Sequence, residues 1–143
     1  MNDMERHPDE RPVVYLASPY SAASADVREW RWRMACRWCA MMANEGFVVW
    51  SPIATAHPLV AFGVRGDWEF WRRQDLHFLG ACDELWVLML DGWLASRGVC
   101  AEMESAIGLG MPVRYVDPNC DGLCVLDTPP DAGLGGVITE TGG

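Results

Sequence analysis

The sequence predicts an α/β fold built on one parallel sheet, and three observations support this prediction. Short apolar runs that suit strands alternate with longer segments whose apolar residues recur at helical spacing. The runs are unbroken, which is typical of strands covered on both faces. The 143 residues are enough for one domain with one core. We therefore expect a single doubly wound parallel sheet of the Rossmann or flavodoxin type, with four to five strands and helices on both faces.

The chain divides into three segments of different composition. Residues 1–12 form a polar leader that lacks the apolar core of a signal peptide. Residues 13–126 carry the strand and helix patterns and form the predicted domain. Residues 127–143 are rich in Gly, Pro and Thr, which predicts a flexible tail.

Strand and helix patterns follow one another along the predicted domain. In chain order they are strand 13–17, a helix from Ser24 or Asp26 to about Asn44, strand 47–50, a loop or short helix within 53–66, a helix after Asp67, strand 85–90, a helix after Ser96, strand 113–116 and a possible fifth strand at 123–126. Asp67 and Ser96 are residue types that cap helix N-termini. Gly46 fits the residue that ends the first helix.

The first helix combines an apolar stripe with arginines. The stripe is predicted to be buried and comprises Val27, Trp30, Met34, Trp38 and Met41. The arginines are Arg28, Arg31, Arg33 and Arg37. A basic and aromatic surface for nucleic acid is one interpretation. A solvated face opposite the buried stripe is favoured, because the formal net charge is −9.

Composition excludes several classes of function. The net charge of −9 argues against a nucleic-acid or anionic membrane partner. No stretch reaches the roughly 18 apolar residues that span a bilayer, so we expect a cytoplasmic protein without a membrane partner. All eleven basic residues are arginine, which excludes a lysine Schiff base and a P-loop. Phosphate contacts would then come from arginine, hydroxyl groups and backbone amides.

Six cysteines are present, but their spacing does not predict a metal site. Cys36 and Cys39 lie within a helical pattern, and only Cys120 and Cys124 form another close pair. We expect reduced thiols that pack in the structure, no metal and no cofactor.

The most informative stretch runs from Asp83 to Asp117. Its apolar strand leads through a loop to Ser96, which can cap the following helix and leave backbone amides free for an anion. Glu102 lies six residues beyond Ser96. A carboxylate so placed can face the crevice where open α/β sheets bind ligands. Glu104 is a second acid on this helix; taking Val99, Met103, Ala106 and Ile107 as the buried stripe, Glu102 lies closer to its edge.

A second acid falls within an apolar stripe. Asp75 follows Trp71 by four residues and precedes Phe78 by three, so it shares their helix face. Such a carboxylate is costly unless it is paired, which favours a functional role. A salt bridge or a cap at a helix end is the alternative.

Several motifs together resemble a known superfamily. They are Tyr15-Leu16-Ala17-Ser18-Pro19-Tyr20-Ser21, then Ser51-Pro52 with His57-Pro58, Trp71-x-x-x-Asp75, and Gly92-Trp93-x-x-Ser96-x-Gly98-x-x-x-Glu102. Over roughly Val13 to Val116 the chain resembles the nucleoside 2-deoxyribosyltransferase-like superfamily and its small DUF1937-type branch. The last motif is the most specific, and it is similar to that of the 2′-deoxynucleoside 5′-monophosphate N-glycosidases.

The resemblance implies a reaction and a role for each matching residue. Glu102 would attack C1′ of a (2′-deoxy)nucleoside 5′-monophosphate or nucleoside and displace the base, after which water or a second base would accept the sugar. Asp75 would hydrogen-bond or protonate the leaving base, and Tyr15 would orient Glu102. Ser96 and the Gly98 amide would hold the 5′-phosphate. A homodimer or higher oligomer is also implied.

Four further residues are secondary candidates for the pocket, each with a structural alternative. Ser18 and Tyr20 line the site or merely build a turn. His57 contacts a base or packs against a helix start. Arg97 binds phosphate or is simply exposed.

Three classes of function remain open from the sequence. They are an N-glycosidase or deoxyribosyltransferase, a non-catalytic nucleotide-binding module of the same fold, and a structural protein that uses this fold without a ligand.

Overall fold

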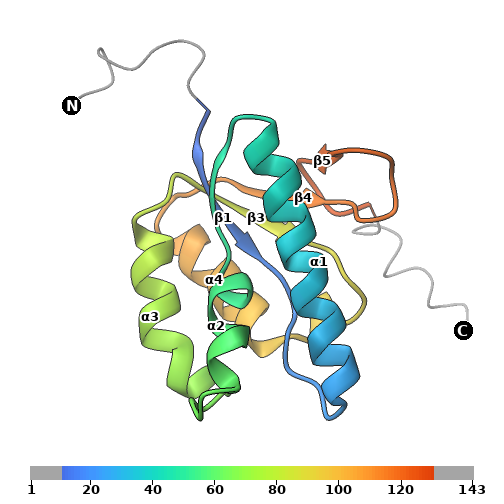
Figure 1. Ribbon diagram of the computed structural model, residues 1–143. Coiled ribbons are helices and arrows are strands. Elements are labelled where there is room, and N and C mark those ends of the chain that lie inside the picture. The colour runs from blue at the N-terminus through green and yellow to red at the C-terminus, as the bar shows by residue number, and fades with distance from the viewer. Residues whose placement is uncertain (1–10, 131–143) are drawn as a thin grey trace, which may run out of the picture.

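The computed structural model describes residues 11–130 and contains one five-stranded sheet (Figure 1). The strands are β1 (Val13–Ala17), β2 (Val48–Trp50), β3 (Glu84–Leu88), β4 (Val113–Val116) and β5 (Val125–Leu126). Their order across the sheet is β2-β1-β3-β4-β5. The first four are parallel and β5 pairs antiparallel with β4. The α/β fold class is confirmed, and the sheet is mostly rather than wholly parallel.

Four helices connect the strands. They are α1 (Ala25–Asn44), α2 (Pro52–Val60), α3 (Trp68–Gly80) and α4 (Arg97–Gly108), and a short 3₁₀ turn spans Trp93–Ala95. The predicted caps are confirmed, since the side chains of Ser24, Asp67 and Ser96 each accept a hydrogen bond from a backbone amide of the following turn. Gly46 has a φ of 97°, a left-handed conformation that ends α1 without the strain a side chain would cause.

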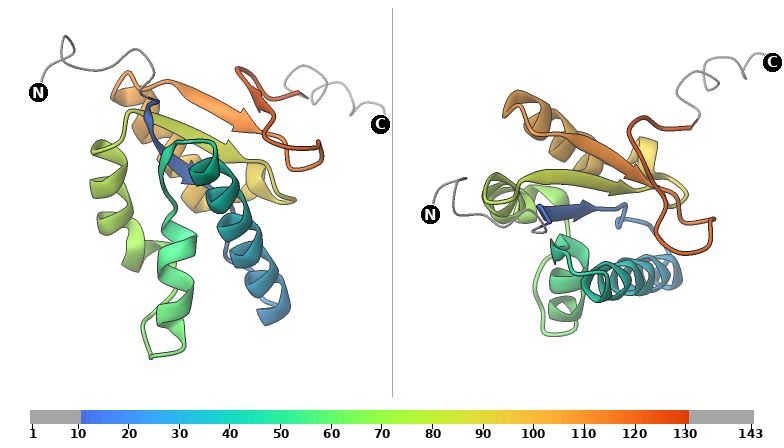
Figure 2. Two further views of the ribbon diagram at one scale, coloured as in Figure 1. Left: turned by 45° about the horizontal axis from the view of Figure 1, so that its top comes forward. Right: turned by 90° about the horizontal axis from the view of Figure 1, so that it is seen from above.

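The two faces of the sheet are covered by different helices, as Figure 2 shows. Val14 and Leu16 of β1 pack with Trp38 and Met42 of α1. The alternate residues of the same strands point the other way, where α3 and α4 contribute Leu79, Val99 and Ala106. Helix α2 packs beside α1 (Figure 1). In this strand order the connections from β1 and β3 leave toward opposite faces, which opens a crevice at the carboxyl ends of these two strands.

Of the stripe predicted on α1, only Trp38 is buried, and Met34 and Met41 are partly buried against the core. Val27 and Trp30 are 38% and 46% exposed, and the other buried residues of the helix are Ala35 and Met42. Helical spacing identifies a face but does not say how far the neighbouring layer extends along it. Here the first turns of α1 project beyond the sheet (Figure 1).

The prediction of six reduced cysteines is wrong for one pair. Cys120 and Cys124 form a disulfide in the segment between β4 and β5, while Cys36, Cys39, Cys82 and Cys100 are free thiols. The predicted leader and tail lie mostly outside the described residues. Between residues 11 and 130, no helix combines the length and apolarity needed to cross a membrane.

Candidate functional site

The candidate site is a pocket of about 480 Å³ above the carboxyl ends of β1 and β3. Eight of the nine candidate residues line it: Ser18, Tyr20, His57, Asp75, Ser96, Arg97, Gly98 and Glu102. The ninth, Tyr15, is fully buried behind the wall and contacts Glu102. Residues from all four helices and three loops therefore meet where the strand order predicts a ligand crevice.

Glu102 lies on the buried face of α4, with only 3% of its surface exposed. The Ser96 hydroxyl caps this helix by accepting from the Val99 amide at 3.2 Å, which places Glu102 below the helix start. The buried residues of α4 are Val99, Glu102 and Ala106. Ile107, taken from the sequence as part of the stripe, is instead 66% exposed. The competing acid Glu104 is exposed and does not line the pocket.

The hydroxyl of Tyr15 donates a hydrogen bond of 2.6 Å to Glu102 Oε2. Both groups are buried, and Tyr15 is held by its position in the centre of β1. The carboxyl of Glu102 has a pKa raised to about 8, mainly by burial and further by the nearby Asp75, while the Tyr15 hydrogen bond lowers it. Burial and the adjacent Glu102 raise the pKa of Tyr15, so this phenol remains a donor.

Asp75 projects from α3 into the same pocket and is 5% exposed. Burial raises the pKa of its carboxyl to about 7. Trp71, one turn earlier on α3, also lines the pocket, as the sequence spacing predicted for a shared face. The salt-bridge alternative is not observed, because none of the ion pairs described within residues 11–130 includes Asp75. Two buried carboxyl groups that titrate near neutrality thus share one cavity.

The first turn of α4 forms the rim of the pocket. Ser96, Arg97 and Gly98 line it, and the positive end of the helix dipole lies there. A Cβ added at Gly98 would lie 3.4 Å from Trp68 Cε3, so the glycine brings the helix backbone close to α3. Arg97 pairs with Glu69 at 2.8 Å, and both side chains are largely exposed.

Ser18 follows β1 and lies on the floor of the pocket, where it is 5% exposed. Its buried hydroxyl has no hydrogen-bond partner among residues 11–130. A buried hydroxyl without a partner loses free energy, and a ligand oxygen or nitrogen in the pocket would supply one.

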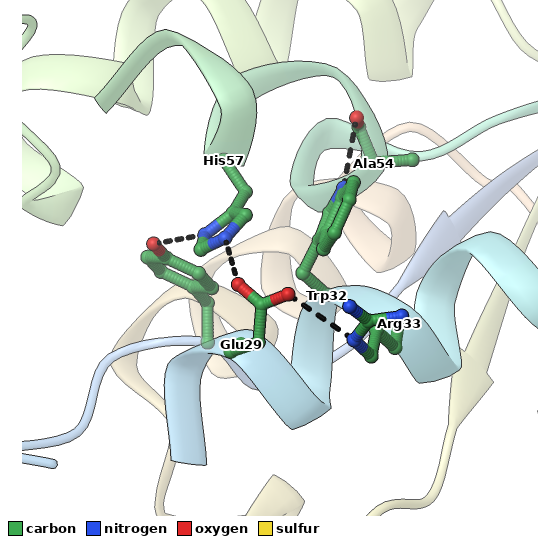
Figure 3. Close-up of polar contacts among 6 residues, drawn as sticks. Glu29, Trp32, Arg33, Ala54 and His57 are labelled. Carbon is green, nitrogen blue, oxygen red and sulfur yellow. Dashed lines mark hydrogen bonds and ion pairs between the residues drawn. The ribbon is translucent and has the colours of Figure 1, made fainter. Parts of the chain in front are cut away.

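Tyr20 and His57 form the part of the pocket wall next to α1. The Tyr20 hydroxyl lies 2.7 Å from His57 Nδ1, and His57 Nε2 lies 3.1 Å from Glu29 Oε1 (Figure 3). The imidazole also stacks on Trp32, with ring centroids 4.8 Å apart. His57 thus both lines the pocket and fastens α2 to α1.

Sequence reasoning missed Arg31, which it assigned to a solvated face. The Arg31 guanidinium donates to the carbonyls of Ser21 at 2.8 Å and Asp91 at 2.9 Å, and it lines the pocket. It therefore ties the loop after β1 to the loop after β3. A Cβ at Gly92 would lie 2.7 Å from Arg31 Nη2, so a side chain there would clash with the guanidinium. The φ of Gly92 is 93°, a left-handed conformation that also favours glycine. No periodic signal marks this contact, because the acceptors are carbonyls of distant loops.

Trp68, the first residue of α3, also lines the pocket. Over residues 11–130, no three His, Cys, Asp or Glu side chains are grouped so that they could hold a metal ion. The polar groups available to a ligand are therefore carboxyls, hydroxyls, arginines and helix amides.

Fold and pocket together define an α/β protein with paired buried carboxyl groups beneath a helix N-terminus. The chain belongs to the family described as a domain of unknown function, DUF1937, whose model matches residues 12–117. That match includes every residue that lines the pocket. A search of curated proteins found no match.

Proposed function

We propose that this protein cleaves the N-glycosidic bond of a (2′-deoxy)nucleoside 5′-monophosphate or nucleoside, with Glu102 as the nucleophile. The observation that carries the proposal is the buried contact of 2.6 Å between the Tyr15 hydroxyl and Glu102 in a pocket that Asp75 also lines. The sequence resemblance to the nucleoside 2-deoxyribosyltransferase-like superfamily supports the same reaction.

The first step forms a bond between Glu102 and the anomeric carbon. A carboxylate oxygen of Glu102 attacks C1′ while the bond from C1′ to the base nitrogen breaks, through a transition state with oxocarbenium character. The electron pair of the broken bond leaves with the base. Tyr15 supports this step because its hydrogen bond favours the charged form of Glu102.

Asp75 supplies the proton that the leaving base requires. Its pKa of about 7 keeps a large fraction of the carboxyl protonated at neutral pH. The two carboxyl groups titrate as a coupled pair, and the reactive form carries one proton, on Asp75. This is the minor of the two singly protonated forms, because the pKa of Glu102 is the higher one. In the second step water, or the nitrogen of another base, attacks C1′ and gives its proton to Asp75, now a carboxylate, while the ester bond from C1′ to Glu102 breaks and releases the Glu102 carboxylate. Hydrolysis and transfer differ only in this acceptor.

The rim of the pocket suits a 5′-phosphate. The amide of Gly98, the hydroxyl of Ser96 and the N-terminus of α4 offer donors and positive potential to an anion. Arg97 adds a cation at the same rim. These groups favour a nucleotide over a free nucleoside, and we propose the monophosphate as the preferred substrate.

The direct test incubates the purified protein with deoxyribonucleoside and ribonucleoside monophosphates and their nucleosides, and measures released base by chromatography. We expect base release from at least one deoxyribonucleoside monophosphate. Glu102→Gln should lower the rate by about a thousandfold or more, since it removes the nucleophile. Glu104→Gln, on the exposed face of the same helix, is the matched control and should retain the wild-type rate.

Two results would overturn the proposal. One is full activity of Glu102→Gln with the fold retained by circular dichroism. The other is nucleotide binding without base release from any substrate, which would favour the non-catalytic nucleotide-binding module.

A further inference from the structure

The pocket has two chemically different ends. Ser96 and Gly98 stand at the α4 end, where the helix dipole suits phosphate. Tyr20 and His57 belong to the opposite end, formed by α2 and the loop after β1. Figure 2 shows α2 beside α1 and α4 across the sheet from them. A nucleotide whose phosphate lies at α4 and whose C1′ lies at Glu102 would direct its base toward this second end.

A hydrogen-bonded chain leads outward from that second end. The Tyr20 hydroxyl is 2.7 Å from His57 Nδ1, and His57 Nε2 is 3.1 Å from Glu29 Oε1. Trp32 stacks on the imidazole, and its own Nε1 donates to the Ala54 carbonyl of α2 at 3.4 Å (Figure 3). The imidazole is thus fixed by two hydrogen bonds and one stacked ring, and its side chain is only 17% exposed.

Glu29, at the outer end of this chain, fixes the direction of its hydrogen bonds. The Glu29 carboxylate only accepts hydrogen bonds, and Arg33 Nε donates to its other oxygen at 3.1 Å. An imidazole with a single ring proton therefore carries it on Nε2 and donates it to Glu29. His57 Nδ1 is left as an acceptor, so the Tyr20 O–H donates to it.

This polarity determines what Tyr20 can offer to a ligand. The hydroxyl proton is committed to His57, so the remaining capacity of the Tyr20 oxygen is that of an acceptor. We propose that Tyr20 is a specificity-determining residue that selects a base bearing a hydrogen-bond donor, an amino group in preference to an oxo group at the same ring position. Glu29 is then a positioning residue, which acts through His57 to hold the Tyr20 proton away from the ligand. This inference rests on the proposed function, which supplies the orientation of the nucleotide.

The test compares pairs of nucleotides of nearly equal shape. The probes are the 2′-deoxy 5′-monophosphates of adenosine against inosine and of cytidine against uridine, which exchange an amino for an oxo group. Dissociation constants are measured by calorimetry on Glu102→Gln protein, so that no nucleotide is consumed, and repeated on wild-type protein wherever no base is released. We expect the amino member of at least one pair to bind about tenfold more tightly, the effect of one hydrogen bond with a partly buried group.

Three further substitutions in the same background distinguish specificity from simple wall packing. Tyr20→Phe should bring the ratio for that pair to about one by weakening the amino ligand. Glu29→Ala should also reduce the ratio, because His57 can then carry its ring proton on Nδ1 instead of Nε2, and the Tyr20 hydroxyl is no longer required to donate to it. Glu29→Gln, whose amide oxygen can still accept from Nε2, should restore most of it. Asp26→Asn, on the exposed first turn of the same helix, is the control and should leave the ratio unchanged.

Equal binding of both members in both pairs would overturn the inference, as would preference for the oxo member or a preference that survives Tyr20→Phe. These results are independent of turnover. Selective binding without base release would refute the proposed reaction and keep the role of Tyr20 in specificity. Base release without selective binding would support the reaction and refute that role.

Discussion

At the scale of single residues, the proposal depends on two buried carboxyl groups that line one pocket, Asp75 and Glu102. Burial raises the pKa of both, to about 7 and about 8. A buried carboxylate without an ion pair destabilises the fold when it ionises. Such groups are therefore more often found at functional sites than in a structural core.

The first prediction concerns stability and pH. Glu102 has a folded-state pKa raised from 4.5 to about 8, so between these values the folded protein holds a proton that the unfolded chain has lost. The free energy of unfolding must then fall as pH rises through this window. Glu102→Gln cannot ionise and escapes this loss. We expect it to match wild type at about pH 4 and to be about 2–4 kcal/mol more stable at about pH 9.

Urea unfolding at a series of pH values measures this difference. The Gln amide can still accept from Tyr15, so the local packing is preserved. A stability difference that stays constant with pH would contradict the raised pKa of Glu102.

Tyr15 gives a second prediction at the same scale. Tyr15→Phe keeps the buried ring and removes the hydrogen bond that lowers the pKa of Glu102. The rate of base release should fall about 10–100-fold, the effect of one hydrogen bond to a charged group. In the profile of kcat against pH, the low-pH limb, where Glu102 becomes protonated, should also move to higher pH. The measurement is kcat against pH for both proteins, and an unchanged limb would show that Tyr15 does not act on Glu102.

Helix α4 joins fold and site at the scale of elements. The Ser96 hydroxyl accepts from the Val99 amide, and this cap begins the helix at the pocket rim. The same turn carries the amides proposed for phosphate, and Glu102 follows on the buried face. One strand–loop–helix unit thus places the helix amides proposed to bind phosphate and a carboxyl group at a fixed separation.

A third prediction tests the double role of Ser96. Ser96→Ala removes the cap and should lower the free energy of unfolding by about 1 kcal/mol. It should also raise KM for a nucleoside monophosphate and leave KM for the matching nucleoside nearly unchanged. Ser96→Thr is the control, because its hydroxyl can still cap and donate. Equal increases in KM for nucleotide and nucleoside would contradict a phosphate role.

Helix α2 shows how an element can form a pocket wall with little core of its own. Only Pro52 of this helix is buried. Its attachment to α1 comes from the polar and stacked contacts of His57 and Trp32. The sequence predicts only a loop or short helix for this segment, since nine residues with an internal Pro58 give a weak helical pattern.

At the scale of the whole molecule, the sequence predicted the layers of the fold well and its long-range polar contacts poorly. Apolar runs and caps located the four parallel strands and three of the helices, because each signal is local. Asp75 could be found since an acid within an apolar stripe is unusual, and Glu102 because it follows a capped helix start at the carboxyl end of a strand. The polar contacts of Arg31 and Glu29 could not be predicted, because their hydrogen-bond partners lie on other elements and depend on how these elements pack. The exposure of Ile107 was missed for the same reason.

The central claim is that Glu102 forms a covalent bond to the sugar, and mass spectrometry of a reaction quenched in acid tests it most directly. With a substrate that releases base, the account predicts a sugar-phosphate adduct on the proteolytic peptide that contains Glu102, and no adduct on Glu102→Gln protein. An adduct on any other residue, or turnover by Glu102→Gln at the wild-type rate, would contradict the account.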